Sequence, residues 1–160
     1  MKCEALAIVA LLLAVALGAQ SETRIAANSS EEPFAAAFSL DKAVAFMDDA
    51  AISWSAKRGC VTCHTNGLYL IARSTTADFR GAAAFRETRK FASAYLKDYV
   101  SGGKARKGRR GAVEGLVATA SFLAISDMAI NRRLSATTRE GLDYIWKIQS
   151  EAGAWSEWLK

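Results

Sequence analysis

The side chains best suited to chemistry lie within five residues, Cys60-Val61-Thr62-Cys63-His64. The chain has one histidine and three cysteines, and the remaining cysteine, Cys3, lies in an amino-terminal segment that we expect to be removed. A structural zinc site needs four such ligands, and no further cysteine or histidine could supply them. A disulfide between cysteines this close in sequence would close a tiny loop and add little stability. The cluster therefore favours cofactor or redox chemistry over a structural role.

The Cys-x-x-Cys-His spacing is the attachment pattern of c-type haem. Two thiols on one turn reach the two vinyl groups of the porphyrin, and the adjacent imidazole lies beneath the iron. The resemblance to c-type cytochromes implies thioether links at Cys60 and Cys63 and a proximal iron ligand at His64. Two other interpretations stay open, namely a labile disulfide or dithiol and a purely local structural role.

The sixth ligand of such an iron is less clearly indicated. Met47 and Met128 are the methionines that follow the amino-terminal segment, and both lie on apolar helical stripes. Methionine at such positions commonly fills a core, which is the alternative for each. We expect one of these two residues, or a vacant or water-filled position, opposite His64.

Residues 1–20 are typical of a secretory signal peptide. Lys2 precedes an apolar run of 13 residues, Ala5–Leu17, and small residues follow it. That run is too short for a spanning helix, which needs about 20 residues. An uncleaved anchor is the alternative. We expect export to the periplasm or cell envelope, a flexible lead-in over residues 21–38 and a helical domain over residues 39–160.

The rest of the chain is globular in composition, with 51% hydrophobic residues, which excludes general disorder. Apolar residues recur at helical spacing, and strand-type alternation is not sustained. The spacing predicts helices over residues 39–58, 68–73, 78–100, 111–130 and 137–149. Ser39 is the expected N-cap of the first helix, and Thr137 with Glu140 forms a capping box for the last. The fourth helix is the most apolar and should lie centrally, in an all-α fold of antiparallel helix pairs.

The carboxy-terminal segment carries a second pattern. Gln149 ends a helix, Gly153 permits a tight turn, and Trp155 can cover the glutamine amide. This arrangement resembles the QW motif of squalene cyclases and related prenyltransferase-like toroids, with Glu140 in place of the usual basic residue. An ordinary helix end with an anchoring tryptophan is the alternative.

Residues 39–160 as a whole resemble the amino-terminal part of exported bacterial proteins with squalene-cyclase or prenyltransferase repeats. The matching stretches are Ser39–Ser55, Cys60–Asn66 and Gly141–Lys160. The resemblance implies a partial α/α toroid of helical hairpins. We expect an incomplete toroid, because repeat folds need several neighbouring units. The cyclase D-x-D-D acid motif is absent, so no cyclase activity is expected, and whether the protein is an enzyme stays open.

A basic run follows the third predicted helix. Its five positive charges are Lys104, Arg106, Lys107, Arg109 and Arg110. In an exported protein, these charges favour an anionic membrane surface or an acidic redox partner, with a solvated loop as the alternative. Nucleic-acid binding is not expected, because no aromatic residues are interleaved with the charges.

Taken together, these patterns predict an exported helical-repeat protein that carries one covalent haem and serves binding or electron transfer. A small c-type cytochrome acting as an electron carrier is one alternative. A non-haem helical interaction module is another.

Overall fold

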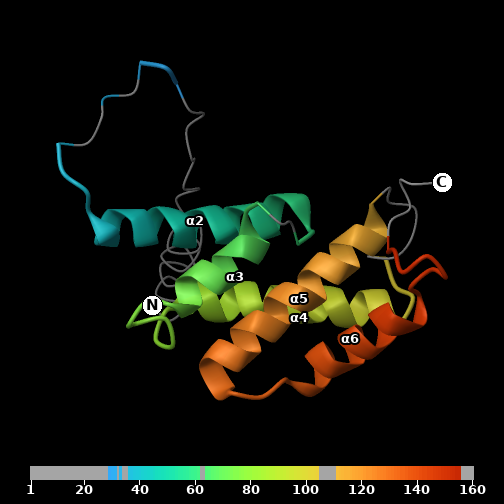
Figure 1. Ribbon diagram of the computed structural model, residues 1–160. Coiled ribbons are helices and arrows are strands. Elements are labelled where there is room, and N and C mark those ends of the chain that lie inside the picture. The colour runs from blue at the N-terminus through green and yellow to red at the C-terminus, as the bar shows by residue number, and fades with distance from the viewer. Residues whose placement is uncertain (1–28, 32, 34–35, 62–63, 105–110, 156–160) are drawn as a thin grey trace, which may run out of the picture. The chain divides into compact units, whose positions relative to one another are not determined.

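The computed structural model describes residues 29–31, 33, 36–61, 64–104 and 111–155. Within these ranges the fold consists of five α-helices without strands, which confirms the all-α prediction (Figure 1). The helices are α2 (Leu40–Arg58), α3 (Asn66–Ser74), α4 (Ala83–Val100), α5 (Ala112–Asn131) and α6 (Ala136–Lys147).

The helices form two layers, and consecutive helices alternate between them. In one layer α4 packs against both α2 and α6, and in the other α3 packs against α5. Each helix also contacts its neighbour in sequence, whereas α2 contacts neither α5 nor α6. Figure 1 shows that successive helices run in alternating directions. The fold is therefore a series of antiparallel helix pairs.

The core lies between the two layers. Leu70 of α3, Leu96 of α4 and Leu116 of α5 are fully buried there. Gly141 allows α6 to approach α4 closely, because a Cβ at that position would lie 2.7 Å from the Leu96 side chain. Helix α5 packs against α3, α4 and α6. By length and composition α5 would also suit a membrane span, a property that core helices share.

The first helix begins and ends where local capping rules predict. The Ser39 hydroxyl accepts a hydrogen bond from the backbone N–H of Lys42, and Ser39 is the N-cap of α2. At the other end, Gly59 adopts a left-handed conformation with φ of 60°, and its N–H donates to the carbonyl of Ser55.

Helix α3 begins at Asn66 rather than Leu68, and two further helix starts differ from the prediction for reasons that their contacts show. Helix α4 begins at Ala83 rather than Asp78, because Asp78 instead accepts hydrogen bonds from Arg73 in a turn that precedes the helix. Helix α6 is capped by Ser135 rather than Thr137, since the Ser135 hydroxyl accepts from the N–H of Thr138. The expected capping box at Thr137 and Glu140 is therefore wrong.

Several expectations concern residues outside those that the structure describes. These are the signal peptide over residues 1–20, most of the lead-in over 21–38, Cys63, and four of the basic residues, Arg106, Lys107, Arg109 and Arg110. Lys104, the fifth residue of the basic run, is exposed.

Candidate functional site

The Cys60–His64 segment connects α2 to α3. Its start is fixed by Asn66, the first residue of α3, whose side chain is fully buried. The Asn66 Nδ2 donates to the Ser55 hydroxyl of α2 and to the Cys60 carbonyl, both at 3.0 Å. Because one amide bonds to both the helix and the connection, the half-buried Cys60 has a defined position beside α2.

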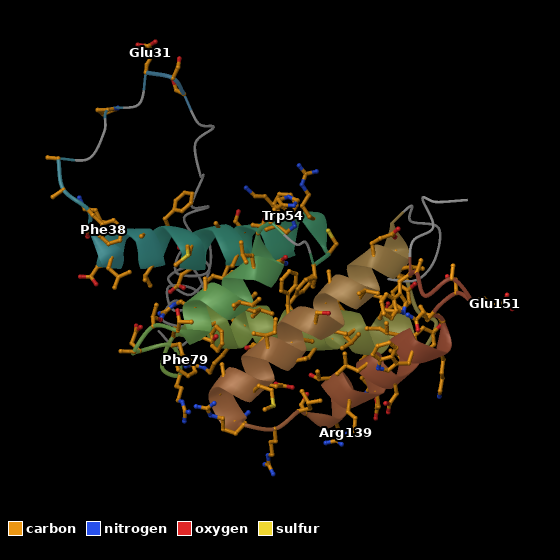
Figure 2. The ribbon with its side chains drawn as sticks, viewed as in Figure 1. Glu31, Phe38, Trp54, Phe79, Arg139 and Glu151 are labelled. Carbon is orange, nitrogen blue, oxygen red and sulfur yellow. The ribbon has the colours of Figure 1, made fainter. Side chains whose placement is uncertain are left out.

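His64 is exposed and lies against an aromatic residue of α2. The His64 and Trp54 rings meet edge to face, with centroids 5.4 Å apart and planes at 79°. Trp54 can be found on α2 in Figure 2. The guanidinium of Arg58 lies 5.4 Å from the Trp54 ring centroid. The Trp54 Nε1 is buried and has no hydrogen-bond acceptor among the described residues.

A pocket of 310 Å³ opens between α2 and α3 at His64. Its other lining residues are mostly apolar, namely Phe46, Met47, Ala50, Ala51, Thr65, Leu68, Tyr69 and Ala72. Phe46 and Leu68 are at least half exposed, which is unusual for large apolar side chains. Of the two candidate methionines, Met47 lines this pocket, whereas Met128 does not and lies exposed on α5.

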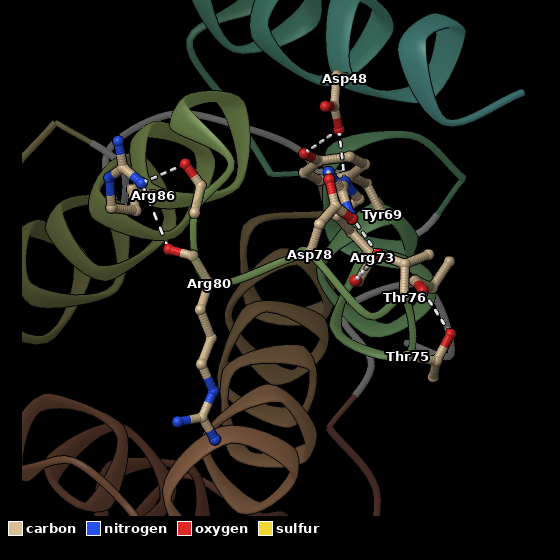
Figure 3. Close-up of polar contacts among 10 residues, drawn as sticks. Asp48, Tyr69, Arg73, Thr75, Thr76, Asp78, Arg80 and Arg86 are labelled. Atoms are coloured by element: carbon tan, nitrogen blue, oxygen red, sulfur yellow. Dashed lines mark hydrogen bonds and ion pairs between the residues drawn. The ribbon is translucent and has the colours of Figure 1, made fainter. Parts of the chain in front are cut away.

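A buried polar network supports one wall of this pocket (Figure 3). The Tyr69 hydroxyl donates to Asp48 Oδ1 at 2.6 Å, and Arg73 Nε donates to the same oxygen at 2.9 Å. The Arg73 guanidinium also donates to both carboxylate oxygens of Asp78, at 2.7 and 3.1 Å, and to the Thr76 hydroxyl. These bonds join α2, α3 and the turn before α4.

The network fixes the protonation states of its members. Burial, with a further contribution from Asp48, raises the pKa of Tyr69 well above its usual range, so Tyr69 is a neutral donor. The hydrogen bond to Asp78 raises the pKa of Arg73 and lowers that of Asp78, so this ion pair persists across physiological pH.

A second buried network joins α4, α5 and the start of α6. Asp127 of α5 is fully buried and accepts from Arg89 at 2.6 Å, from the Ser135 N–H at 2.8 Å and from the Thr138 hydroxyl at 2.7 Å. Arg89 also donates to the Ser126 hydroxyl. Burial alone raises the pKa of Asp127, but these hydrogen bonds outweigh it and lower the pKa below its ordinary value of 3.8.

Neither network was predicted from the sequence. A signal existed in the second case, because Asp127 directly follows the uncharged stretch Gly115–Ser126 of the most apolar helix. A carboxylate in that position requires a buried partner. Arg73, at the end of the apolar stretch Leu68–Ala72, gave a similar signal.

The carboxy-terminal motif residues form a compact turn after α6. The Gln149 side-chain N–H donates to the Gly153 carbonyl at 2.8 Å, and Gly153 has a φ of 79°. The Trp155 Nε1 donates to the Ile145 carbonyl at 2.8 Å, and its ring meets Trp146 at 5.3 Å. The tryptophan, rather than the glutamine, therefore satisfies a carbonyl at the end of the helix.

Within the described residues, no three His, Cys, Asp or Glu side chains lie together as a metal-ion cage requires. The haem hypothesis needs one protein ligand, so this observation does not bear on it. Comparison of the chain with family models, with curated proteins and with solved structures found no match.

Proposed function

We propose that the chain is an exported helical-repeat protein that carries one covalent haem c at Cys60, Cys63 and His64, with a role in binding or electron transfer. The observation that carries this proposal is the exposed imidazole of His64 at the mouth of an apolar pocket between α2 and α3. When bound, the haem would supply a one-electron redox centre.

The residues around His64 fit such a group. Phe46 and Leu68 offer exposed apolar surface that a porphyrin would cover, and burial of apolar area is favourable by about 25 cal/mol per Å². The Trp54 ring meets the imidazole edge to face and adds aromatic surface beside it. Asn66 donates to the Cys60 carbonyl, which fixes the backbone at the first attachment residue.

The two-layer fold supports a partial α/α toroid. In such a toroid, helices alternate between an outer and an inner ring, as α2, α4 and α6 alternate here with α3 and α5. Gln149, Gly153 and Trp155 form a turn after the last described helix, where a QW motif would place them, and Trp155 bonds to the Ile145 carbonyl. We therefore propose the toroid over the small cytochrome, in which the chain would wrap around the haem.

The deciding experiment is to produce the full chain in a host that attaches haem c. The intact mass should rise by one haem, and the pyridine haemochrome spectrum should be that of a haem with two thioether links. The variant Cys60→Ser/Cys63→Ser should show neither change. A colourless wild-type protein from that host would overturn the proposal. The hypothesis of a non-haem interaction module would then remain.

A matched pair of variants tests the sixth ligand. Met47 lines the His64 pocket and Met128 does not, so Met47→Leu should alter the visible spectrum of the haem-loaded protein while Met128→Leu leaves it unchanged. If neither variant alters the spectrum, the position opposite His64 is vacant or held by water.

A further inference from the structure

A second pocket, of 390 Å³, lies at the amino-terminal end of α4 and shares no lining residue with the His64 pocket. It is lined by Phe79, Arg80, Phe85, Arg86, Arg89, Lys90, Ser93 and Ile130. Half of these residues are basic, none is acidic, and three of the others are large and apolar. The pocket therefore combines an apolar surface with a concentration of positive charge.

The apolar part is well ordered by packing. Phe85 is 2% exposed, and its ring meets that of Phe79 edge to face at 5.6 Å. Ile130, from α5, packs against the core and completes the apolar lining. Residues from the turn before α4, from α4 itself and from α5 thus build the pocket together.

Three of its four positive charges have no acidic partner among the described residues. Arg89 pairs with Asp127, which neutralises it. Arg80 instead lies over the Phe79 ring, 5.4 Å from its centroid, and donates to the backbone carbonyl of Ile130 at 2.9 Å. Arg86 donates to the carbonyls of Arg80 and Gly81 (Figure 3). Lys90 is exposed at the same pocket. Neutral carbonyls orient the two guanidinium groups and leave their charge uncompensated.

The start of α4 adds to this positive field. The helix has 18 residues, and the N-cap residue Ala82 has no side-chain acceptor for the first-turn N–H groups. The amino-terminal end of a helix carries a partial positive charge that favours nearby anions. This end lies at Phe85 and Arg86, within the pocket lining.

We propose that this pocket binds a small amphipathic anion, with its carboxylate or phosphate head at Arg86 and Lys90 and its apolar chain or ring against Phe79 and Ile130. The planar guanidinium matches both head groups through paired hydrogen bonds. The volume lies in the range of small-molecule sites. The apolar lining selects against small inorganic anions, and the charge selects against neutral lipids. This proposal is independent of the haem.

Calorimetric titration of the full chain with single-chain probes below their micelle concentrations tests the proposal. Decanoate and decyl phosphate should bind at least tenfold more tightly than decanol and decyltrimethylammonium, which have the same chain length. Acetate and inorganic phosphate should bind at least tenfold more weakly than the decyl anions. Equal affinity for decanol, or equal affinity for the short anions, would overturn the proposal.

Paired variants locate the site. Arg86→Gln/Lys90→Gln should weaken decanoate binding at least tenfold. Lys97→Gln/Arg139→Gln removes the same charge from two exposed residues that do not line the pocket, and should leave the affinity unchanged. If both double variants lost the same affinity for decanoate, the anion would be responding to the overall charge of the protein, and the proposed site would be overturned. Circular dichroism checks that each variant keeps the wild-type helix content.

Two further measurements distinguish the apolar part and the source of the anion. Ser93→Phe places an aromatic ring in the pocket lining without changing charge, and should also weaken decanoate binding at least tenfold. Vesicles of phosphatidylglycerol present the same head-group chemistry in a membrane. If the protein sedimented with these vesicles in a way that depends on Arg86 and Lys90, yet did not bind free decanoate, the basic residues would bind a membrane surface. That outcome would overturn the proposed pocket ligand.

Discussion

Arg73 and Asp127 are both buried ions, but their partners differ in exposure. The carboxylates that Arg73 holds are partly in water, since the side chains of Asp48 and Asp78 are 22% and 74% exposed. Asp127 is itself fully buried, and so is its partner Thr138, while the side chain of Arg89 is 21% exposed. Removal of a charge costs most where its former partners cannot turn to solvent. The two networks should therefore respond differently to substitution.

Arg73→Met should destabilise the fold by about 2 kcal/mol. Methionine fills much of the same buried space, and Asp48 and Asp78 can regain water, so the loss is that of the hydrogen bonds alone. Urea unfolding followed by circular dichroism measures the change. The exposed Arg139→Met is the control and should change stability by less than about 0.5 kcal/mol. A variant as stable as the wild type would show that the Arg73 network contributes nothing net.

Asp127→Ala should cost more, about 3 kcal/mol, because it leaves the Thr138 hydroxyl and the Ser135 N–H without their acceptor and removes the partner of Arg89. Asp143→Ala, an exposed carboxylate on α6, is the matched control. Urea unfolding at pH 7 compares the two. Similar losses in both variants would contradict the assigned role of Asp127.

The same residue predicts a dependence on pH. The folded-state pKa of Asp127 is lowered below 3.8, so its stabilisation is complete above that value and is lost as the pH falls through the folded-state pKa. The stability difference between wild type and Asp127→Ala should thus be constant from pH 7 to about pH 5 and shrink below about pH 4. Urea unfolding across this range measures it. A difference that grew in acid would mean that the pKa is raised instead.

At the scale of the element, the end of α6 depends on one long-range side-chain bond. The Trp155 indole donates to the Ile145 carbonyl, ten residues earlier, while its ring contacts Trp146. Trp155→Phe retains an aromatic ring and removes the donor, so it should cost about 1 kcal/mol. Amide exchange should rise at residues 145–150 and stay unchanged in α2. Trp146→Phe, at a largely exposed position, should change stability less.

The ends of elements were predictable where the determinant is local. Ser39 and Gly59 bound α2 through contacts within one turn, and these residue types carry that preference in the sequence itself. Asp78 and Thr137 are acceptable caps too, but each loses to a side-chain contact made outside its own turn, five residues away for Asp78 and eight residues away for Ser135. Arg73 holds Asp78 in a turn, and Asp127 selects Ser135 as the cap of α6. Sequence spacing cannot reveal such competition, because tertiary packing decides it.

In the candidate site, too, local features were predictable from the sequence and contacts between helices were not. Cys60 and His64 form one local pattern, so the attachment segment was visible in the sequence. The contact of Trp54 with His64 was not predicted, because it depends on how the connection that Asn66 bonds to α2 is packed. Met47 and Met128 were equivalent by sequence, and the packing of α2 on α3 places only Met47 at the His64 pocket.

At the scale of the whole molecule, the first and last described helices do not touch. Helix α2 contacts α3 and α4, and α6 contacts α4 and α5. Because the two end helices share only the middle helices, one end can open locally without the other. The two ends should therefore show separable local stabilities.

Ala51→Gly tests this separation. Ala51 is 1% exposed in the middle of α2, and glycine there lowers helix stability by about 1 kcal/mol. Hydrogen exchange measured by mass spectrometry should rise in α2 and, to a smaller extent, in α3, with α6 unchanged. Ile145→Val, a buried change of about 1 kcal/mol in α6, should give the reverse pattern. An equal rise across all five helices in both variants would mean that the layers open as a single cooperative unit, although α2 and α6 make no contact with each other.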